Sequence, residues 1–235
     1  MEEMRQEYES SKIVPSVSMR ELIMNPALRI PLIISILIMI AQQFSGINAV
    51  MTFSTGIFEK AGLDMTGAGY ATMGVGAMNV VMTIVSLVLV ERCGRKTLLL
   101  FGFGGMVIDT ALLTICLAYA ENSTVAKYLS VILVILFVVF FASGPGSIPW
   151  FLVSELFNQS ARPVATSIAI AVNWSANFIV LMAFPLLKVI CGSNVFIIFV
   201  VFQFLFTLFI YKKVPETKNK TIEEISSMFR QQTYQ

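Results

Sequence analysis

Side-chain amides that recur at helical spacing inside long apolar stretches are the residues of this sequence best suited to binding chemistry. In the first stretch, steps of three, three and four residues place one polar set on a single helix face: Gln42, Ser45, Asn48 and Thr52. Gln43 can join that face only if the helix unwinds near Gly46, which the Ser45-Gly46 pair permits.

Two further apolar stretches carry polar residues at similar spacing. Alternating steps of four and three residues define a second single face: Thr72, Gly76, Asn79, Thr83 and Ser86. In a later stretch, Asn173 and Asn177 are four residues apart. Because an amide both donates and accepts hydrogen bonds, three helices that present amides suit an uncharged ligand rich in hydroxyl groups. The alternative, which any single Asn fits equally well, is hydrogen bonding between helices.

The segment Gly144-Pro145-Gly146-Ser147-Ile148-Pro149-Trp150 interrupts another apolar stretch with two glycines and two prolines. Because hydrocarbon penalises unpaired backbone groups, such a break is tolerated only where protein buries it or where it lines a wet cavity. Discontinuous helices of this kind form the midplane sites of transporters. Trp150 is therefore interpreted as a stacking platform for a sugar ring rather than an interface anchor, whereas Trp174 is interpreted as a packing residue.

The elements that must position these residues are membrane spans. The chain is 57% hydrophobic and 13% charged, with a mean hydropathy of +0.81. Blocks near the roughly 20 residues that cross a bilayer occur six times: Ile30–Phe53, Tyr70–Val90, Thr97–Tyr119, Tyr128–Val153, Val164–Leu187 and Val195–Tyr211. A charged segment precedes the first block, so that block is not a cleavable signal peptide. We expect an all-α membrane protein with six transmembrane helices in a lipid bilayer.

The distribution of Lys and Arg predicts the orientation of these spans. With the amino terminus inside, all Lys and Arg residues except Lys60, Lys127 and Lys188 fall on the inner side. This bias predicts that both termini are cytoplasmic. The net charge of +2 therefore reflects topology, and we expect no nucleic-acid partner.

Enzyme and cofactor chemistry are disfavoured. The chain has no His, and its three cysteines are scattered, so we expect no metal site, no cofactor and no disulfide framework. A phosphate-binding loop ending in Lys-Ser or Lys-Thr is missing, and the glycines from Gly102 to Gly105 are better explained by close helix packing. Asn122 begins a sequon, but its closeness to the membrane disfavours glycosylation.

Charged residues cluster in the inner loops. Glu91, Arg92 and Arg95 lie in a tight hairpin, and Glu155 and Arg162 bracket the connection after the fourth span. Either these charges are anchors, or they pair in one conformation and separate in another, which would form a gate. The sequence does not decide between the anchor and the gate.

Several motifs occur together and in order: Gln42–Ala49, Glu91–Lys96, Gly144–Trp150, Glu155–Phe157 with Arg162-Pro163, Asn173-Trp174 and Pro215–Lys218. They resemble the carboxy-terminal half of the facilitative glucose transporters of the major facilitator superfamily, over about Val17 to Arg230. Met1–Glu9 resembles the cytoplasmic linker between the two halves of that family. The resemblance implies a linker at 1–25, a six-helix half-transporter domain at 26–213 and a cytoplasmic tail at 214–235.

The resemblance also implies a function and its residues. It implies facilitative transport of a hexose by alternating access, with plasma membrane as the family's usual location. The implied sugar contacts are Gln42, Gln43, Asn48, Asn79 and Trp150. The implied gating and salt-bridge residues, which steady the outward-open state, are Glu91, Arg92, Arg95, Glu155, Arg162 and Glu216. The helix break comprises Gly144, Pro145, Gly146 and Pro149.

Three positions depart from the family pattern. Thr52-Phe53 stands where glucose carriers show Tyr-Tyr, and Ala142 stands where they usually show Glu before the break. Both changes affect which substrate we expect the protein to bind, because the first alters the outer gate and the second removes a polar contact near the sugar. Asp109 is a carboxylate in a span that is typically uncharged, and it shares a face with Gly102 and Gly105. That face predicts a helix interface, where we expect Asp109 to be protonated or linked to water.

The family needs two six-helix halves, and this sequence supplies one. Three explanations follow, in order of preference: a fragment or truncated product, a regulatory or inert partner of a full-length carrier, and a pair of identical copies. A channel is disfavoured because the spans carry neither a charge ring nor a carbonyl filter. Proton coupling is not favoured either, because Asp109 is the only carboxylate well inside a span.

Overall fold

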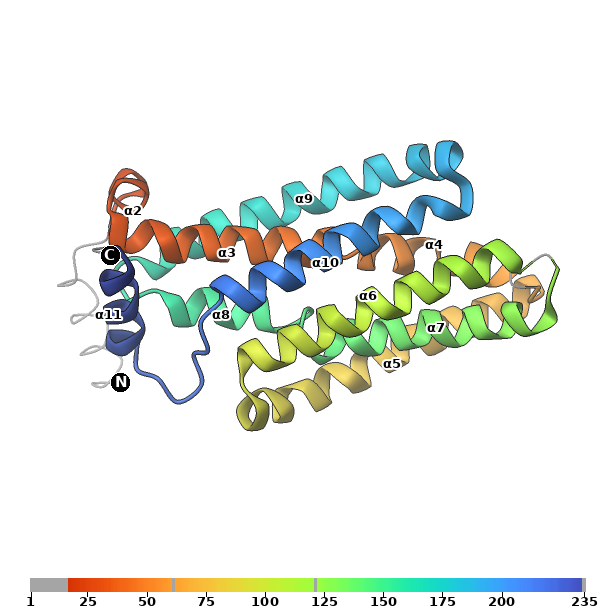
Figure 1. Cartoon of the computed structure of the whole chain (residues 1–235), viewed down its shortest axis with the longest axis horizontal. Helices are drawn as coiled ribbons and strands as arrows, with labels where there is room; N and C mark the ends of the chain where they lie inside the picture. The colour runs from red at the N-terminus through yellow and green to blue at the C-terminus, as the bar shows by residue number, and fades with distance from the viewer. Residues whose placement is uncertain (1–16, 61, 121, 234–235) are drawn as a thin grey trace, which may run out of the picture.

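In the part of the chain that the computed structural model describes, six helical units that are long and apolar enough to cross a membrane run side by side (Figure 1). The structure describes residues 17–60, 62–120 and 122–233. The units are Pro26–Glu59, Met65–Cys93, Arg95–Tyr119, Thr124–Leu156, Arg162–Cys191 and Val195–Lys213. Each predicted block falls within one unit, so the prediction of six spans is confirmed.

Two of the six units are broken in the middle. The first consists of α3 (Pro26–Phe44) and α4 (Ile47–Lys60), and the fourth consists of α7 (Thr124–Ser143) and α8 (Ile148–Leu156). The other units are single helices: α5 (Met65–Cys93), α6 (Arg95–Tyr119), α9 (Arg162–Cys191) and α10 (Val195–Lys213). A short 3₁₀ turn, η1 (Gly192–Asn194), joins α9 to α10. Both breaks fall where the sequence places glycines, at Gly46 and in the segment Gly144–Trp150, as predicted from the sequence.

The bundle has two distinguishable ends (Figure 1). At one end lie the short helix α2 (Met19–Met24), the helix α11 (Ile222–Thr233) and the turn between α5 and α6; we name it the α11 end. At the other end lie η1 and the ends of α4 and α6; we name it the η1 end. Most of the predicted 1–25 linker lies outside the described residues. Its last part contains α2, and the predicted 214–235 tail contains α11, so these domain boundaries stay predictions.

Local sequence signals account for where the helices begin. Asn25 accepts a hydrogen bond from the backbone N–H of Ala27, and Asp64 accepts one from Gly67, so both residues cap helix N-termini. Pro26 stands at the first position of α3, where its missing donor costs nothing. At the start of α11, the side chains of Thr221 and Glu224 cap each other's backbone N–H groups.

Close packing of α6 against the α7–α8 unit explains two of the three glycines between positions 102 and 105, Gly102 and Gly105. A Cβ atom on Gly102 would lie 2.2 Å from Cδ of Pro145, and one on Gly105 would lie 2.3 Å from Cδ1 of Phe140. Only glycine permits this approach at either position. Gly102 and Gly105 are therefore packing residues, as predicted from the sequence, whereas Gly104 has open space at its Cβ position.

Apolar contacts form two main core clusters, one toward each end. The cluster toward the α11 end includes Ile38, Phe103 and Ile148, and it also takes in Ile225 and Phe229 from α11. Through these two residues, α11 packs against α3 and α8 rather than lying apart from the bundle. The cluster toward the η1 end is centred on large buried side chains: Phe58, Met106, Leu113, Phe137 and Phe184.

Candidate functional site

The break in the first unit changes which side chains can meet. Gly46 has φ of +91°, a left-handed conformation that favours glycine, and a Cβ atom there would lie 2.8 Å from Cγ of Phe199. The helix resumes at Ile47, whose N–H donates to Oγ of Ser45 at 3.4 Å. As a result, Gln43 joins Asn48, whose Nδ2 donates to Oε1 of Gln43. The expectation that Gln43 requires unwinding near Gly46 is confirmed.

The break in the fourth unit leaves backbone carbonyls that the helix cannot satisfy. The carbonyl of Pro145 would pair with the residue four positions on, but that residue is Pro149, which has no N–H. Gln42 supplies the donor instead: its Nε2 lies 2.9 Å from the oxygen of Pro145 and 2.8 Å from that of Gly146. One amide of the first unit thus stabilises the break in the fourth.

Asn173 of α9 joins Gln42 and Gln43 into one network. Its Nδ2 donates to Oε1 of Gln42 at 2.8 Å and to the carbonyl of Met39 at 3.2 Å. Its Oδ1 accepts from Nε2 of Gln43 at 2.9 Å. Asn177, one turn further, donates from Nδ2 to Oε1 of Gln43 at 3.1 Å. We name the five side chains the amide cluster: Gln42, Gln43, Asn48, Asn173 and Asn177.

Burial divides the amide cluster into two parts. Gln42, Gln43 and Asn173 are buried, whereas Asn48 and Asn177 are half-buried. Within the described residues, the Oδ1 atoms of Asn48 and Asn177 make no hydrogen bond, although their Nδ2 atoms do. The buried amides therefore fix the half-buried pair in place. Two carbonyl oxygens are left that could accept hydrogen bonds from the hydroxyl groups of a neutral ligand.

The other two predicted sugar contacts lie outside this network. Asn79 is half-buried on α5, a helix that packs on α4 and α7, and its side chain forms no hydrogen bond in the described part of the chain. Trp150 stands on α8 with its side chain 39% exposed. Trp174 on α9 is 63% exposed in this chain, and its interpretation as a packing residue stays a prediction. The roles of Asn79 and Trp150 as ligand contacts stay predictions.

Sequence reasoning left Asn173 and Asn177 out of the set of sugar contacts, although it noted them. The available signal was their spacing of four residues inside an apolar stretch. What the spacing could not reveal is that α9 packs along α3, which brings Asn173 against two glutamines.

A second polar cluster lies at the α11 end. Arg95 donates from Nε and Nη2 to Oε1 of Glu155 at 2.9 and 2.7 Å, and this ion pair is partly exposed. Oγ1 of Thr217 donates to Oε2 of Glu155 at 2.5 Å. The carboxylate of Glu216 accepts from the backbone N–H groups of Arg95 and Lys96 at 2.9 and 3.1 Å, which caps α6. The segment after α10 therefore closes against the start of α6.

The structure brings together only part of the predicted gating set. Arg95, Glu155 and Glu216 meet, although Glu216 contacts backbone rather than an arginine side chain. Arg162 donates to the carbonyl of Phe157 at 3.2 Å. Glu91 and Arg92 are exposed, and in the described residues their side chains enter no ion pair. Gating by these residues stays a prediction.

Asp109 lies buried on α6, 2% exposed, on the glycine face that packs against α7. Neither of its carboxyl oxygens has a hydrogen-bond partner among the described residues. The same part of the chain holds no group of three or more Cys, Asp or Glu side chains that could bind a metal ion.

Curated relatives match nearly the whole chain. A facilitated glucose transporter, member 1 of solute carrier family 2, from Gallus gallus is 46% identical over 231 residues, which are 98% of this chain and 47% of that protein. Member 3 from Bos taurus is 44% identical over 99% of this chain and 47% of its own length. The chain therefore spans about half the length of the curated relatives it matches.

Solved structures match the fold. The proton:xylose symporter XylE, a major facilitator superfamily protein bound to 6-bromo-6-deoxy-D-glucose, has a TM-score of 0.74 and 31% identity. The match covers 84% of this chain and 42% of the symporter. An inward open structure of XylE from E. coli has a TM-score of 0.69 and 30% identity, over 84% of this chain and 41% of that one. The six helices form one half of a major facilitator superfamily fold.

The relatives and the solved matches are transporters rather than enzymes. A family model described as "Sugar (and other) transporter" matches residues 1–229, which is almost the entire sequence. On that match, this chain belongs to the sugar (and other) transporter family.

Proposed function

We propose that this chain forms one half of a carrier that lets a hexose cross a membrane down its gradient by alternating access. The observation that supports this most is the amide cluster, which joins the two broken units to α9. Buried Gln43, which Asn173 fixes in turn, accepts hydrogen bonds from half-buried Asn48 and Asn177. The side-chain oxygens of Asn48 and Asn177 can accept hydrogen bonds from sugar hydroxyls. Neutral amides suit an uncharged sugar because they bind it without the cost of burying an unpaired charge.

The names of the relatives support the same substrate class. Two are facilitated glucose transporters, and XylE is described as a xylose symporter that also binds a bromo-deoxy-glucose. We include Trp150 in the proposed site as a surface on which a sugar ring can stack. Trp150 follows the helix break that Gln42 stabilises, and its side chain is partly exposed. Asn79 is included in the proposed site only because the resemblance to the facilitative glucose transporters implies that it contacts the sugar.

The proposal includes an orientation and a gate. The excess of Lys and Arg in the loops at the α11 end supports a cytoplasmic location for that end. The plasma membrane is proposed on the family resemblance alone. The contacts of Arg95 and Thr217 with Glu155 tie the start of α6, α8 and the segment after α10 together. Opening the cavity to the cytoplasm would have to separate these elements, so we assign this cluster to the inner gate.

A complete cavity requires a second wall. The best candidates for its contact surface are α5 and α9, because only 17% of the most apolar stretch of each helix is buried, the smallest share among the six units. On α5, Gly69, Gly74 and Gly76 have open space where a Cβ atom would lie, and small residues let membrane helices approach closely. The partner is either an amino-terminal half or a second copy of this chain.

Uptake of radiolabelled glucose and fructose into liposomes that contain only the purified chain tests the proposal. We expect Asn48→Ala and Trp150→Ala to reduce uptake by at least about tenfold, the effect of losing about 1.4 kcal/mol of binding. The matched control is Ser175→Ala on α9, because the Ser175 hydroxyl bonds only within its own helix. Uptake that survives both site substitutions would refute the assigned site.

A second candidate function is that of a transport-inactive partner of a full-length carrier. The exposed apolar faces of α5 and α9 favour it, because they offer a surface for another protein in the bilayer. No uptake from folded, helical protein, together with co-purification of a full-length carrier, would support this candidate. Cross-linking of the chain to itself, together with uptake, would instead support the pair of copies.

A further inference from the structure

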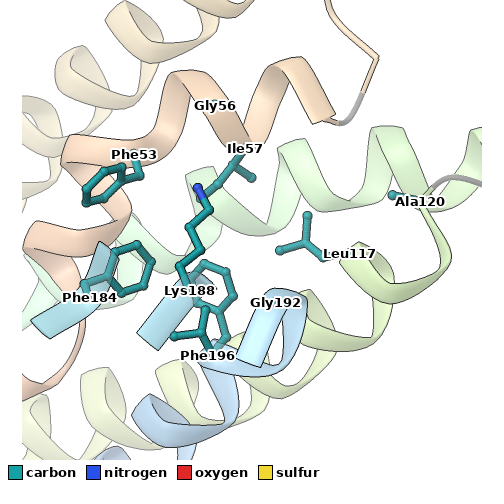
Figure 2. Close-up of a pocket in the computed structure, with 10 residues that line it drawn as sticks. Phe53, Gly56, Ile57, Leu117, Ala120, Phe184, Lys188, Gly192 and Phe196 are labelled. Atoms are coloured by element: carbon teal, nitrogen blue, oxygen red, sulfur yellow. The ribbon is translucent and has the colours of Figure 1, made fainter. Parts of the chain in front are cut away.

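A pocket of about 180 Å³ opens at the η1 end, between α4, the ends of α6 and α9, η1 and the start of α10 (Figure 2). Its lining is largely apolar: Phe53, Gly56, Ile57, Leu117, Ala120, Phe184, Lys188, Gly192, Val195 and Phe196. None of the residues assigned to the proposed sugar site is among these lining residues, so the pocket is a separate feature.

Three aromatic rings from three helices form one side of the pocket. Phe184 of α9 lies against Phe53 of α4, with ring centroids 5.0 Å apart, and against Phe196 of α10, at 6.1 Å. Both distances fall within the range in which aromatic rings attract one another. Phe184 and Phe196 are also buried. An aromatic ring that enters the pocket therefore meets partners that their own contacts already hold in place.

The space in the pocket suits one ring. No atom lies within 4 Å of the place where a Cβ atom would stand on Gly56 of α4 or on Gly192 of η1, so both glycines leave room. An engineered apolar cavity of roughly 150 Å³ binds benzene, and this pocket is slightly larger. The pocket can therefore hold a six-membered ring with a small substituent.

The charge in the lining is already engaged. Lys188 reaches from α9 toward α4, and its Nζ lies 5.4 Å from the ring centroid of Phe53 (Figure 2). Lys188 also takes part in a further interaction. An anion in the pocket would therefore have no lining cation left to pair with, and burying an unpaired charge among apolar groups costs far more than burying a neutral molecule. The pocket thus favours an uncharged ligand.

We propose that this pocket binds an uncharged molecule that carries a single aromatic ring, about the size of benzyl alcohol. The ring lies against Phe53, Phe184 and Phe196. Such a ligand contacts α4, α9 and α10 at once and binds only the folded chain, so it raises the stability of the fold. Neither the binding nor its test depends on the proposed sugar transport.

The aromatic side of the pocket continues to the break in the first unit. Phe184 stacks on Phe199 of α10, with ring centroids 5.8 Å apart. Phe199 in turn packs against Gly46, where a Cβ atom would lie 2.8 Å from its Cγ atom. Because α4 resumes directly after Gly46, a ligand that holds Phe53 against Phe184 restrains the whole of α4 relative to α9 and α10.

The test uses the full chain in phosphatidylcholine nanodiscs and fluorine NMR of three probes. The probes are neutral 4-fluorobenzyl alcohol, anionic 4-fluorobenzoate and the unbranched 6-fluorohexan-1-ol, and empty nanodiscs correct for partition into lipid. We expect saturable binding of the benzyl alcohol, at least about tenfold tighter than that of the other two probes. Equal or tighter binding of the anion or of the unbranched chain, or no saturable binding to folded protein, would overturn the proposal.

Variants separate volume from charge. Gly56→Leu on α4 and Leu117→Phe on α6 each add volume to the pocket, and both are expected to weaken binding of 4-fluorobenzyl alcohol by at least about tenfold. The matched control is Gly104→Leu on α6, which also has open space at its Cβ position but lies outside the pocket. Lys188→Met keeps the apolar stem and is expected to change the affinity by less than about threefold. Unchanged binding in both filling variants, an equal loss in the control, or a tenfold loss in Lys188→Met would contradict the assigned site.

Hydrogen exchange followed by mass spectrometry locates the bound ring. With saturating 4-fluorobenzyl alcohol, we expect exchange to slow more in α4 than in α8, because α4 lines the pocket and α8 contributes no residue to it. Gly56→Leu is expected to remove this difference. Equal slowing in α4 and α8, or no slowing in α4, would contradict the placement of the ring between α4, α9 and α10.

Discussion

The carboxylate of Glu216, after α10, packs directly against Gly94, between α5 and α6, because a Cβ atom on Gly94 would lie 2.6 Å from Oε2 of Glu216. Gly94 also has φ of +90°, which side chains with a Cβ rarely adopt. Because no Cβ is present, the carboxylate of Glu216 reaches the N–H groups of Arg95 and Lys96 and meets the positive end of α6. Nearby, Nζ of Lys218 donates to the carbonyl of Arg92, near the end of α5, at 2.6 Å.

Gly94→Ala is therefore expected to lower the free energy of unfolding by about 1–3 kcal/mol, from backbone strain and the displaced carboxylate. Denaturant titration in detergent, followed by circular dichroism, measures this change. Gly74→Ala is the matched control, because Gly74 lies inside α5 with open space at its Cβ position. A loss of similar size in both variants would show that the contact with Glu216 has no special importance.

Asn173→Ala is expected to cost about 1–3 kcal/mol of unfolding free energy. Without Asn173, Oε1 of Gln42 and Nε2 of Gln43 lose hydrogen-bond partners in a buried environment. Asn177→Ala is expected to cost less, because Asn177 is half-buried and water can replace its contact. The same titration ranks the two variants, with Ser175→Ala as the control, and the reverse order would contradict a central role of Asn173 in the amide cluster.

Gly144→Ala is expected to destabilise the break in the fourth unit by at least about 2 kcal/mol. Its Cβ atom would lie 2.4 Å from the backbone oxygen of Leu98, and backbone cannot move aside as a flexible side chain can. Gly104→Ala meets no atom within 4 Å and improves helix propensity, so it should be neutral or stabilising. The yield of folded protein after size-exclusion chromatography and the unfolding midpoint both report this contrast.

Asp109→Leu is expected to stabilise the chain by about 1 kcal/mol or more. The carboxyl of Asp109 is buried with no hydrogen-bond partner in the described residues, and a similar-sized apolar side chain removes the cost of burying it. Thr110→Val is the neighbouring comparison and should lose about 1 kcal/mol, because Oγ1 of Thr110 accepts from Nε2 of Gln203 at 3.1 Å. A drop in the unfolding midpoint of Asp109→Leu would mean that the carboxyl has a partner, such as bound water.

Features that depend on near neighbours in the chain were predictable. Each predicted apolar block became a membrane-length unit, and the glycines at Gly46 and Gly144 marked where two units break. The proposal that Gln43 joins the polar face after unwinding also held, because it depends on the local geometry of six residues. The pairing between Gln42 and the carbonyl of Pro145 was not predictable, since the two residues are 103 positions apart.

The sequence by itself therefore determined the number of spans, their breaks and the types of side chain they carry, because hydropathy and helical period are local properties. Tertiary structure alone decided which polar groups meet. Packing of α9 along α3 selected Asn173 as the centre of the amide cluster, and return of the segment after α10 turned Glu216 into a cap for α6. The tertiary structure also placed Lys188 among phenylalanines from three helices, α4, α9 and α10. These contacts join segments far apart in the chain, and local patterns carry no information about which helix faces approach one another.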